Sequence, residues 1–275
     1  RYDPQWRTSW EEIYAGELRR RPWFVVAGNH DWAGNVFAQL DRTDAGGWRM
    51  PWLWHDQRGT PWGRSDIHLF FIDTIMWRQD ESAAFRLCGQ GLRIEDIQRQ
   101  KRWLGAALAA SGAPIKLVFG HHPIYSVRTQ GSYYGMADLD ALLFDHGVTA
   151  YINGHDHCMY HISAPDWRGR SSARMHYICS GAGSQMRAVH PSCIPRGLAS
   201  ETACVTKDQL GPRQPFWHAF FTKSDQNPEL DLKGGFALFQ VQDKDIGIRF
   251  VEAVADPSEG QLWRERYSAT LPYPR

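Results

Sequence analysis

Three short segments rich in glycine and histidine most constrain what this chain can fold into. They are Gly28-Asn29-His30-Asp31, Gly120-His121-His122-Pro123 and Gly154-His155-Asp156-His157. Each follows an apolar run, at 24–26, 117–119 and 150–152, that is typical of a buried strand. The glycine then lets the chain turn sharply as it leaves the sheet. Because three strands deliver Asn and His side chains to one edge of a sheet, the pattern predicts a site for a hard or borderline metal ion.

The length and charge of the chain exclude several classes of protein. Its 275 residues suffice for one large domain with a substantial core. The formal net charge of +1 gives no indication of nucleic acid or of an anionic membrane surface as a partner. No apolar stretch approaches the roughly 20 residues that a membrane helix requires. We therefore predict neither a nucleic-acid partner nor a membrane span.

Along the chain, predicted strands alternate with predicted helices up to residue 152, which indicates an α/β layered sheet. The predicted helices are 5–18, 93–110 and 137–146, and the predicted strands are 23–27, 68–72, 115–119 and 148–152. Later runs at 176–179, 236–241, 246–254 and 264–270 predict further strands, the last three antiparallel.

Because no clear linker interrupts the chain, residues 1–275 are predicted to form a single domain, with 186–233 as a long irregular insertion. Residues 41–66, which contain Trp48, Trp52, Trp54 and Trp62, are predicted to be a long surface excursion.

The third segment carries the clearest metal-ligand spacing. If His155 and His157 stay extended, their side chains project to the same face and can reach two neighbouring metal ions. An isolated His-x-His pair is usually structural or incidental. Its place after an apolar strand and a glycine, with two similar strand ends elsewhere, favours metal binding.

The first two segments offer further ligands, each with an alternative. Asn29 is either a neutral oxygen ligand or a residue that tolerates a tight turn. His30 would face away from Asn29 along an extended chain, and could contact a substrate or leaving group. Asp31 either fixes the His30 tautomer or caps the local turn. Of the adjacent pair His121 and His122, we predict the first as the ligand and the second as a residue that lines the cleft and binds substrate.

These segments, in this order, resemble the metallophosphoesterase superfamily, and within it the purple acid phosphatases of the small, tartrate-resistant type. Other matching stretches are Pro22 to Ala27, Phe71 to Thr74, Gly147 to Tyr151, Ser180 to Gly183 and Gly234 to Phe236. The resemblance implies a metallophosphoesterase-type four-layer α/β/β/α sandwich with two mixed sheets. It also implies a binuclear centre, with Fe and a second Fe, Zn or Mn, that hydrolyses phosphoric monoesters.

Roles follow from the resemblance residue by residue. Asn29, His121 and His155 match the ligands of the divalent ion, and His157 matches a ligand of the iron. His30 matches the histidine that assists the substrate or leaving group.

Two departures from the family pattern accompany the match. The family carries two Asp motifs upstream of Gly-Asn-His-Asp, and we expect the source polypeptide to carry them before Arg1. Thr129 and Gln130 stand where relatives often place an acidic residue and a histidine. Either His122 or His190 substitutes for them, or protonation of the leaving group falls to His30 alone.

The cysteines give an indication of the cellular compartment in which the protein resides. Cys193 and Cys204 could form a local disulfide, which would imply an oxidising compartment, but the odd count of five leaves at least one thiol free. The prediction is a secreted protein or one within a secretory or lysosomal-type compartment.

The leading hypothesis is an acid-phosphatase-like metallophosphoesterase acting on a phosphate ester. The alternative is a catalytically degenerate family member that serves as a structural or binding subunit of a larger assembly. Its protein partners would contact the Trp-rich loop and the 186–233 segment. A single-metal phosphodiesterase or nuclease is less favoured, because no basic patch with interleaved aromatic residues stands out.

Overall fold

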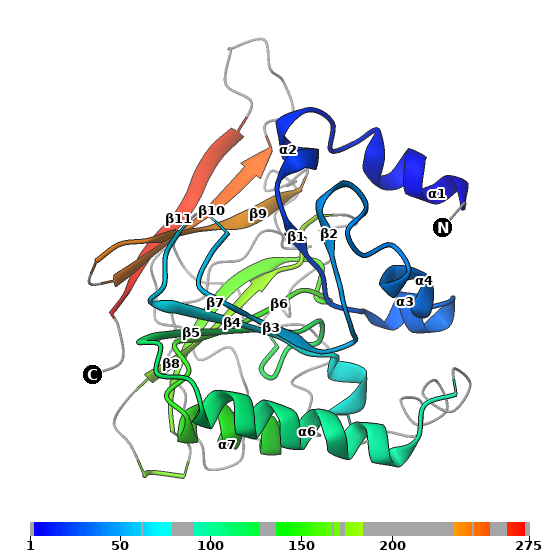
Figure 1. The fold of residues 1–275 in the computed structure, drawn as a ribbon. Coiled ribbons are helices and arrows are strands. Elements are labelled where there is room, and N and C mark those ends of the chain that lie inside the picture. Colours follow the sequence, from blue (N-terminus) through cyan, green and yellow to red (C-terminus); the bar gives the residue numbers. More distant parts are fainter. Residues whose placement is uncertain are drawn as a thin grey trace. The chain divides into compact units, whose positions relative to one another are not determined.

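A computed structural model describes most of the chain (Figure 1): residues 3–61, 63–78, 91–126, 136–166, 168–170, 174–183, 234–243, 245–253 and 263–272. The chain forms two compact units. The first comprises residues 1–111 and 119–121, and the second comprises 112–118 and 122–275. Among the described residues, no helix combines the length and apolarity needed to cross a membrane.

The first unit contains short helices and paired strands. Strand β1 (Trp23–Phe24) is parallel to β2 (Trp48–Arg49), and β3 (His55–Arg58) is antiparallel to β4 (Ile67–Phe71). The unit also contains a 16-residue helix, α6 (Ile94–Ala109). The short helices and helical turns are α1 (Pro4–Trp6), η1 (Arg7–Glu11), α2 (Glu17–Arg20), α3 (Asn29–Ala33), α4 (Phe37–Leu40), η2 (Ala45–Gly47) and η3 (Thr74–Met76).

Two sequence predictions for this unit are wrong. The helix expected over 5–18 is broken after Glu11, and Gly16, at φ 64°, adopts a left-handed conformation before α2 begins. The excursion expected over 41–66 is exposed only in part, because its middle enters the core. Met50, Leu53 and Trp54 pack with Trp32 and Val36 in one buried cluster. Gly and Pro in this segment mark chain reversals, and chain reversals do not require exposure.

The second unit contains a mixed sheet. Strands β5 (Ile115–Phe119, its last residue in the first unit), β6 (Ala150–Asn153), β8 (Arg174–Ser180) and β7 (Met159–Pro165) lie in that order. Strand β6 is parallel to β8, whereas β7 is antiparallel to it. This mixed sheet confirms the predicted α/β class. Helix α7 (Ala137–Asp145) ends before Gly147, which has φ 60°, as the sequence predicts.

Strand β7 was not predicted. Its sequence, Met-Tyr-His-Ile-Ser-Ala-Pro, lacks a continuous apolar run, yet its first six residues are buried. Partly buried hydrogen bonds supply partners for its polar side chain His161, which bonds to both Tyr267 and His176.

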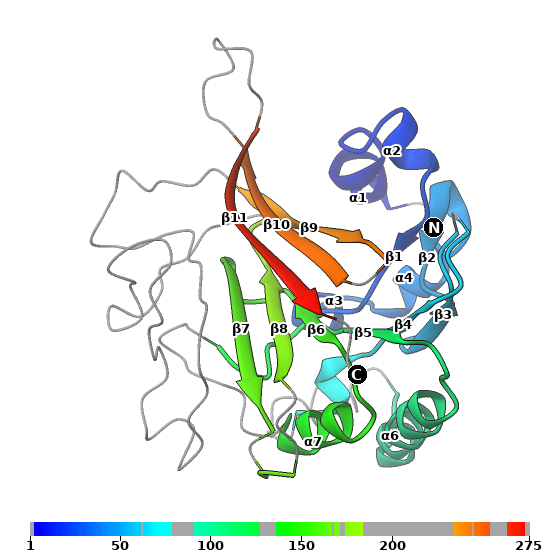
Figure 2. The ribbon, with the colours of Figure 1, turned by 90° about the vertical axis from the view of Figure 1, so that its left-hand side faces the viewer.

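A second sheet in this unit consists of β9 (Gly235–Val241), β10 (Asp245–Ala253) and β11 (Trp263–Pro272), with β10 in the centre (Figure 2). Both pairings are antiparallel over the described residues, as predicted for these runs. The predicted 186–233 insertion, Trp62, Thr129, Gln130, His190 and the Cys193–Cys204 pair lie outside the described residues.

Candidate metal centre

Asn29 and His121, 92 residues apart in sequence, meet in the first unit. The Asn29 Oδ1 atom lies 2.8 Å from His121 Nε2, and both residues are partly buried. Because an amide oxygen only accepts, His121 Nε2 donates in this contact. Two predicted ligands of one ion thus converge, with the neutral oxygen and nitrogen chemistry that a divalent transition metal accepts.

The backbone next to this pair leaves no space for a larger residue than glycine. A Cβ atom at Gly28 would lie 2.8 Å from His121 Cε1 and 2.9 Å from His121 Nδ1. The Gly28 N–H donates to Asp31 Oδ2 at 2.8 Å, and the Gln39 amide donates to Asp31 Oδ1 at 2.7 Å. Asp31 therefore caps the turn, which was one of its two predicted roles.

His30 follows Asn29 on α3 and is exposed. The extended chain predicted for Asn29 and His30 is wrong, because helix α3 begins at Asn29. Consecutive helical residues point about 100° apart, so the two side chains still diverge.

In the second unit, His155 and His157 are not extended as predicted. Their φ angles are 62° and 53°, in the left-handed region that non-glycine residues adopt rarely. Each such residue costs about 1–2 kcal/mol and persists only where its surroundings impose it. The turn after β6 therefore depends on contacts that hold it.

Asp156, between the two histidines, supplies such contacts. It is buried, and its Oδ2 atom accepts from the Ser126 hydroxyl at 2.6 Å and from the Tyr160 hydroxyl at 2.7 Å. Burial raises the pKa of Tyr160 well above its usual range, which keeps this hydroxyl a donor. Sequence reasoning did not identify Asp156, Ser126 or Tyr160 as site residues. The acidic residue within Gly-His-Asp-His was the available signal.

Gly181 supports the same turn from β8. A Cβ atom there would lie 3.0 Å from the His157 backbone nitrogen, and the Gly181 N–H donates to the Cys158 carbonyl at 3.0 Å. The Ser180-Gly181-Ala182-Gly183 stretch, noticed only as part of the family resemblance, thus has a packing role at the histidine turn.

His122 is fully buried beside His155. The two ring centroids lie 4.5 Å apart, and ring nitrogens of the two residues lie within 4.8 Å of each other. The Tyr151 hydroxyl donates to the His122 carbonyl at 2.6 Å. The substrate-binding role of His122 stays a prediction.

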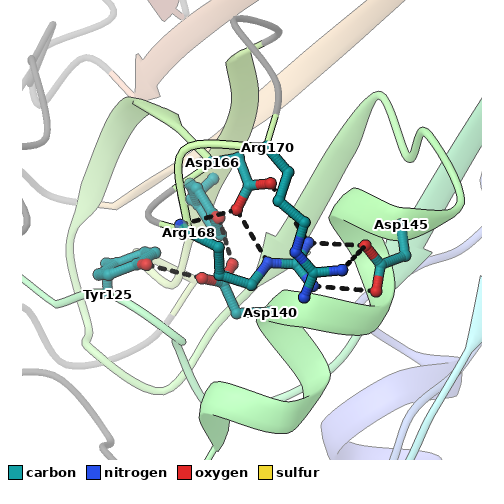
Figure 3. A network of polar contacts seen from close by, with 7 residues as sticks. Tyr125, Asp140, Asp145, Asp166, Arg168 and Arg170 are labelled. Carbon is teal, nitrogen blue, oxygen red and sulfur yellow. Dashed lines mark hydrogen bonds and ion pairs between the residues drawn. The ribbon is translucent and has the colours of Figure 1, made fainter.

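A polar network anchors the segment that follows His122 (Figure 3). The Tyr125 hydroxyl donates to Asp140 on α7 at 2.7 Å. Nearby, the Arg168 guanidinium bridges Asp145 and Asp166, at 2.8 Å and 2.9 Å. Hydrogen bonding to Arg168 lowers the pKa of Asp145. Because Tyr125 adjoins Ser126, this network fixes one of the donors to Asp156.

Of the predicted ligands, Asn29 and His121 belong to the first unit, and His155 and His157 belong to the second.

Comparison with known proteins identifies the family and the fold. Residues 2–159 match the family described as calcineurin-like phosphoesterase. The chain is 29% identical to tartrate-resistant acid phosphatase type 5 of Rattus norvegicus over 258 residues, covering 91% of this chain and 69% of the relative. It is 31% identical to purple acid phosphatase 4 of Arabidopsis thaliana over 192 residues, covering 66% and 53% respectively.

Two solved structures share the fold. The structure described as GAP50, the anchor in the inner membrane complex of Plasmodium, superposes with a TM-score of 0.66 at 24% identity, covering 100% of this chain and 74% of that one. A purple acid phosphatase from yellow lupin (Lupinus luteus) seeds gives a TM-score of 0.52 at 15% identity, covering 94% and 40%.

Proposed function

The chain belongs to the calcineurin-like phosphoesterase family, and we propose that it is a metal-dependent, acid-phosphatase-like hydrolase of phosphoric monoesters. The observation that carries the proposal is the 2.8 Å approach of Asn29 Oδ1 to His121 Nε2. The residues nearest this pair serve to present it: Gly28 leaves space for the imidazole, and Asp31 holds the turn. The donor set fits a divalent ion.

In this proposal Asn29, His121 and His155 hold the divalent ion, which is Fe, Zn or Mn, and His157 is a ligand of the iron. Family relatives support the assignment, and carboxylate ligands from the two family Asp motifs would complete the binuclear centre. Such a centre, when bound, supplies the positive charge that activates water and stabilises phosphoryl transfer.

His30 is the proposed catalytic residue. It is exposed and directly follows the ligand Asn29, whereas Asp31 uses both carboxylate oxygens to hold the turn. In this proposal the His30 imidazole donates a proton to the leaving oxygen of the bound ester.

The test is metal content together with phosphatase activity of the complete protein. We expect about two equivalents of bound metal, and a loss of at least 100-fold in kcat/KM for His155→Ala. His146→Ala, at the end of α7, is the matched control and should retain wild-type activity. A metal-loaded wild type that hydrolyses no phosphate monoester would overturn the proposal.

A second candidate is a non-catalytic structural subunit. It is favoured by one observation: the fold match to the Plasmodium anchor protein extends over the whole chain. This candidate predicts fewer than one equivalent of metal and no hydrolysis in the complete protein. Two equivalents of metal, with activity that His155→Ala abolishes, would exclude it.

A further inference from the structure

The first unit contains a cavity of about 540 Å³, which we call the tryptophan pocket. Its volume lies within the range of small-molecule sites, roughly 300–1,000 Å³. Residues from the N-terminal helical segment, α3, α4 and β2 line it, including Asp3, Trp6, Trp10, His30, Asp31 and Trp48.

Three indoles form its apolar wall. Trp48 is nearly perpendicular to both neighbours, with ring centroids 5.0 Å from Trp6 and 5.4 Å from Trp10. The Trp48 indole N–H donates to the Gln39 carbonyl at 3.1 Å, which fixes that ring. A rigid aromatic wall favours a flat, ring-shaped ligand group.

The charged groups of the wall are acidic. Asp3 and Asp31 line the tryptophan pocket, and its described lining contains neither Lys nor Arg. Arg42 and Arg19 lie over the Trp6 and Trp10 rings, 5.1 Å and 6.0 Å from the centroids, but neither lines the cavity. A second anionic group on a ligand would therefore meet the like charge of Asp3 and Asp31, and the only cationic group in the described lining is the His30 imidazolium that protonates the leaving oxygen in the proposed function.

The tryptophan pocket reaches the proposed catalytic residue. His30 and Asp31 are the second and third residues of α3, directly after Asn29. Because His30 lines the cavity, an ester whose leaving oxygen accepts a proton from the His30 imidazole has its alcohol part at the cavity.

We propose that the tryptophan pocket binds the alcohol part of the phosphate ester, and that it selects uncharged ring alcohols over alcohols with a second anionic group. This inference rests on the proposed hydrolase function. Trp6, Trp48 and Asp3 are the specificity-determining residues in this proposal, the indoles by contact with the ring and Asp3 by its charge.

Two ratios of kcat/KM in the metal-loaded, complete protein test it. Trp6→Ala should lower the ratio for phenyl phosphate over methyl phosphate by about tenfold, because a ring contact is lost. Trp52→Leu, an exposed tryptophan outside the cavity, should leave that ratio at the wild-type value. If Trp6→Ala lowered kcat/KM for phenyl phosphate and for methyl phosphate by the same factor, the proposal would be overturned.

The second ratio compares phenyl phosphate with 4-carboxyphenyl phosphate, which differs by one carboxylate. Asp3→Asn should reduce the wild-type preference for phenyl phosphate by about threefold, since a repulsive charge is removed. Asparagine is as good a helix cap as aspartate, so the hydrogen bond from the Gln5 N–H, 2.9 Å in the wild type, can be kept. Glu17→Gln, an exposed acid outside the cavity, is the control. An unchanged preference in Asp3→Asn would contradict the charge argument.

A binding readout separates this proposal from the hydrolase function. In metal-free protein, phenyl phosphate should quench tryptophan fluorescence at lower concentration than 4-carboxyphenyl phosphate, and Trp6→Ala should remove the difference. Quenching of this kind in a protein without activity would overturn the hydrolase function alone. Activity without any such selectivity would overturn the tryptophan pocket alone.

Discussion

Single residues decide how the candidate ligands are presented. The Asn29–His121 pair depends on the absence of a side chain at Gly28, whose φ of −108° any residue can adopt. Space, and not backbone conformation, therefore requires glycine at this position. His155 and His157 are the opposite case, because their left-handed φ angles are imposed by contacts to Asp156 and Gly181.

Gly28→Ala should displace the His121 imidazole and weaken metal binding by at least tenfold, with a parallel loss of kcat/KM. The physical reason is a Cβ atom 2.8 Å from His121 Cε1, closer than any tolerated carbon contact. Metal titration followed by calorimetry measures the effect. Gly112→Ala, where an added Cβ meets nothing within 4 Å, is the control. Wild-type metal affinity in Gly28→Ala would show that His121 is not a ligand.

At the scale of elements, helix α6 holds the end of strand β4 through one buried side chain. The Asp73 N–H donates to Gln100 Oε1 at 2.8 Å, and the Gln100 amide donates to the Asp73 carbonyl at 3.0 Å. Gln100 thus completes the backbone hydrogen bonding of a residue that has left the strand.

Gln100→Leu should lower the free energy of unfolding by about 2–4 kcal/mol, because it leaves two buried backbone groups without a partner. Urea denaturation measures the change. Gln98→Leu alters an exposed residue of the same helix and should cost less than about 0.5 kcal/mol. Similar losses in the two variants would mean that the contact to Asp73 contributes little.

At the scale of the whole molecule, a buried acid links folding to pH. Burial raises the pKa of Asp73 to about 7, although hydrogen bonds from the Ile75 N–H and the Trp32 indole favour its charged form. The folded protein then binds a proton that the unfolded chain releases near pH 4. The contribution of Asp73 to the free energy of unfolding is fully present below pH 4 and is lost as the pH rises toward 7.

The free energy of unfolding should therefore fall between pH 4 and pH 7, by up to about 4 kcal/mol from Asp73. Asp73→Asn does not titrate, so its unfolding free energy should lack this part of the pH dependence. Urea denaturation of both proteins at several pH values gives the comparison. Identical slopes would show that Asp73 is not the source.

The sequence alone predicted the elements that have a local signature. Strand β5 matches its predicted bounds, Ile115–Phe119, because a short apolar run bounded by Pro and Gly has few alternatives. Helix α7 ends before Gly147 because a positive φ there is accessible to glycine at little cost. The three Gly-to-His segments likewise identified the family before any coordinates, since ligand type and order are properties of the sequence.

Only the tertiary structure decided how those residues are used. The turn at His155 and His157 is left-handed because the nearby Tyr160, together with Ser126 and Gly181 from distant parts of the sequence, holds it. The middle of the 41–66 segment enters the core because Met50, Leu53 and Trp54 pack with Trp32 of α3 and its neighbours. Composition and periodicity report a residue's own preference, whereas burial and strain depend on partners that the chain brings together only by folding.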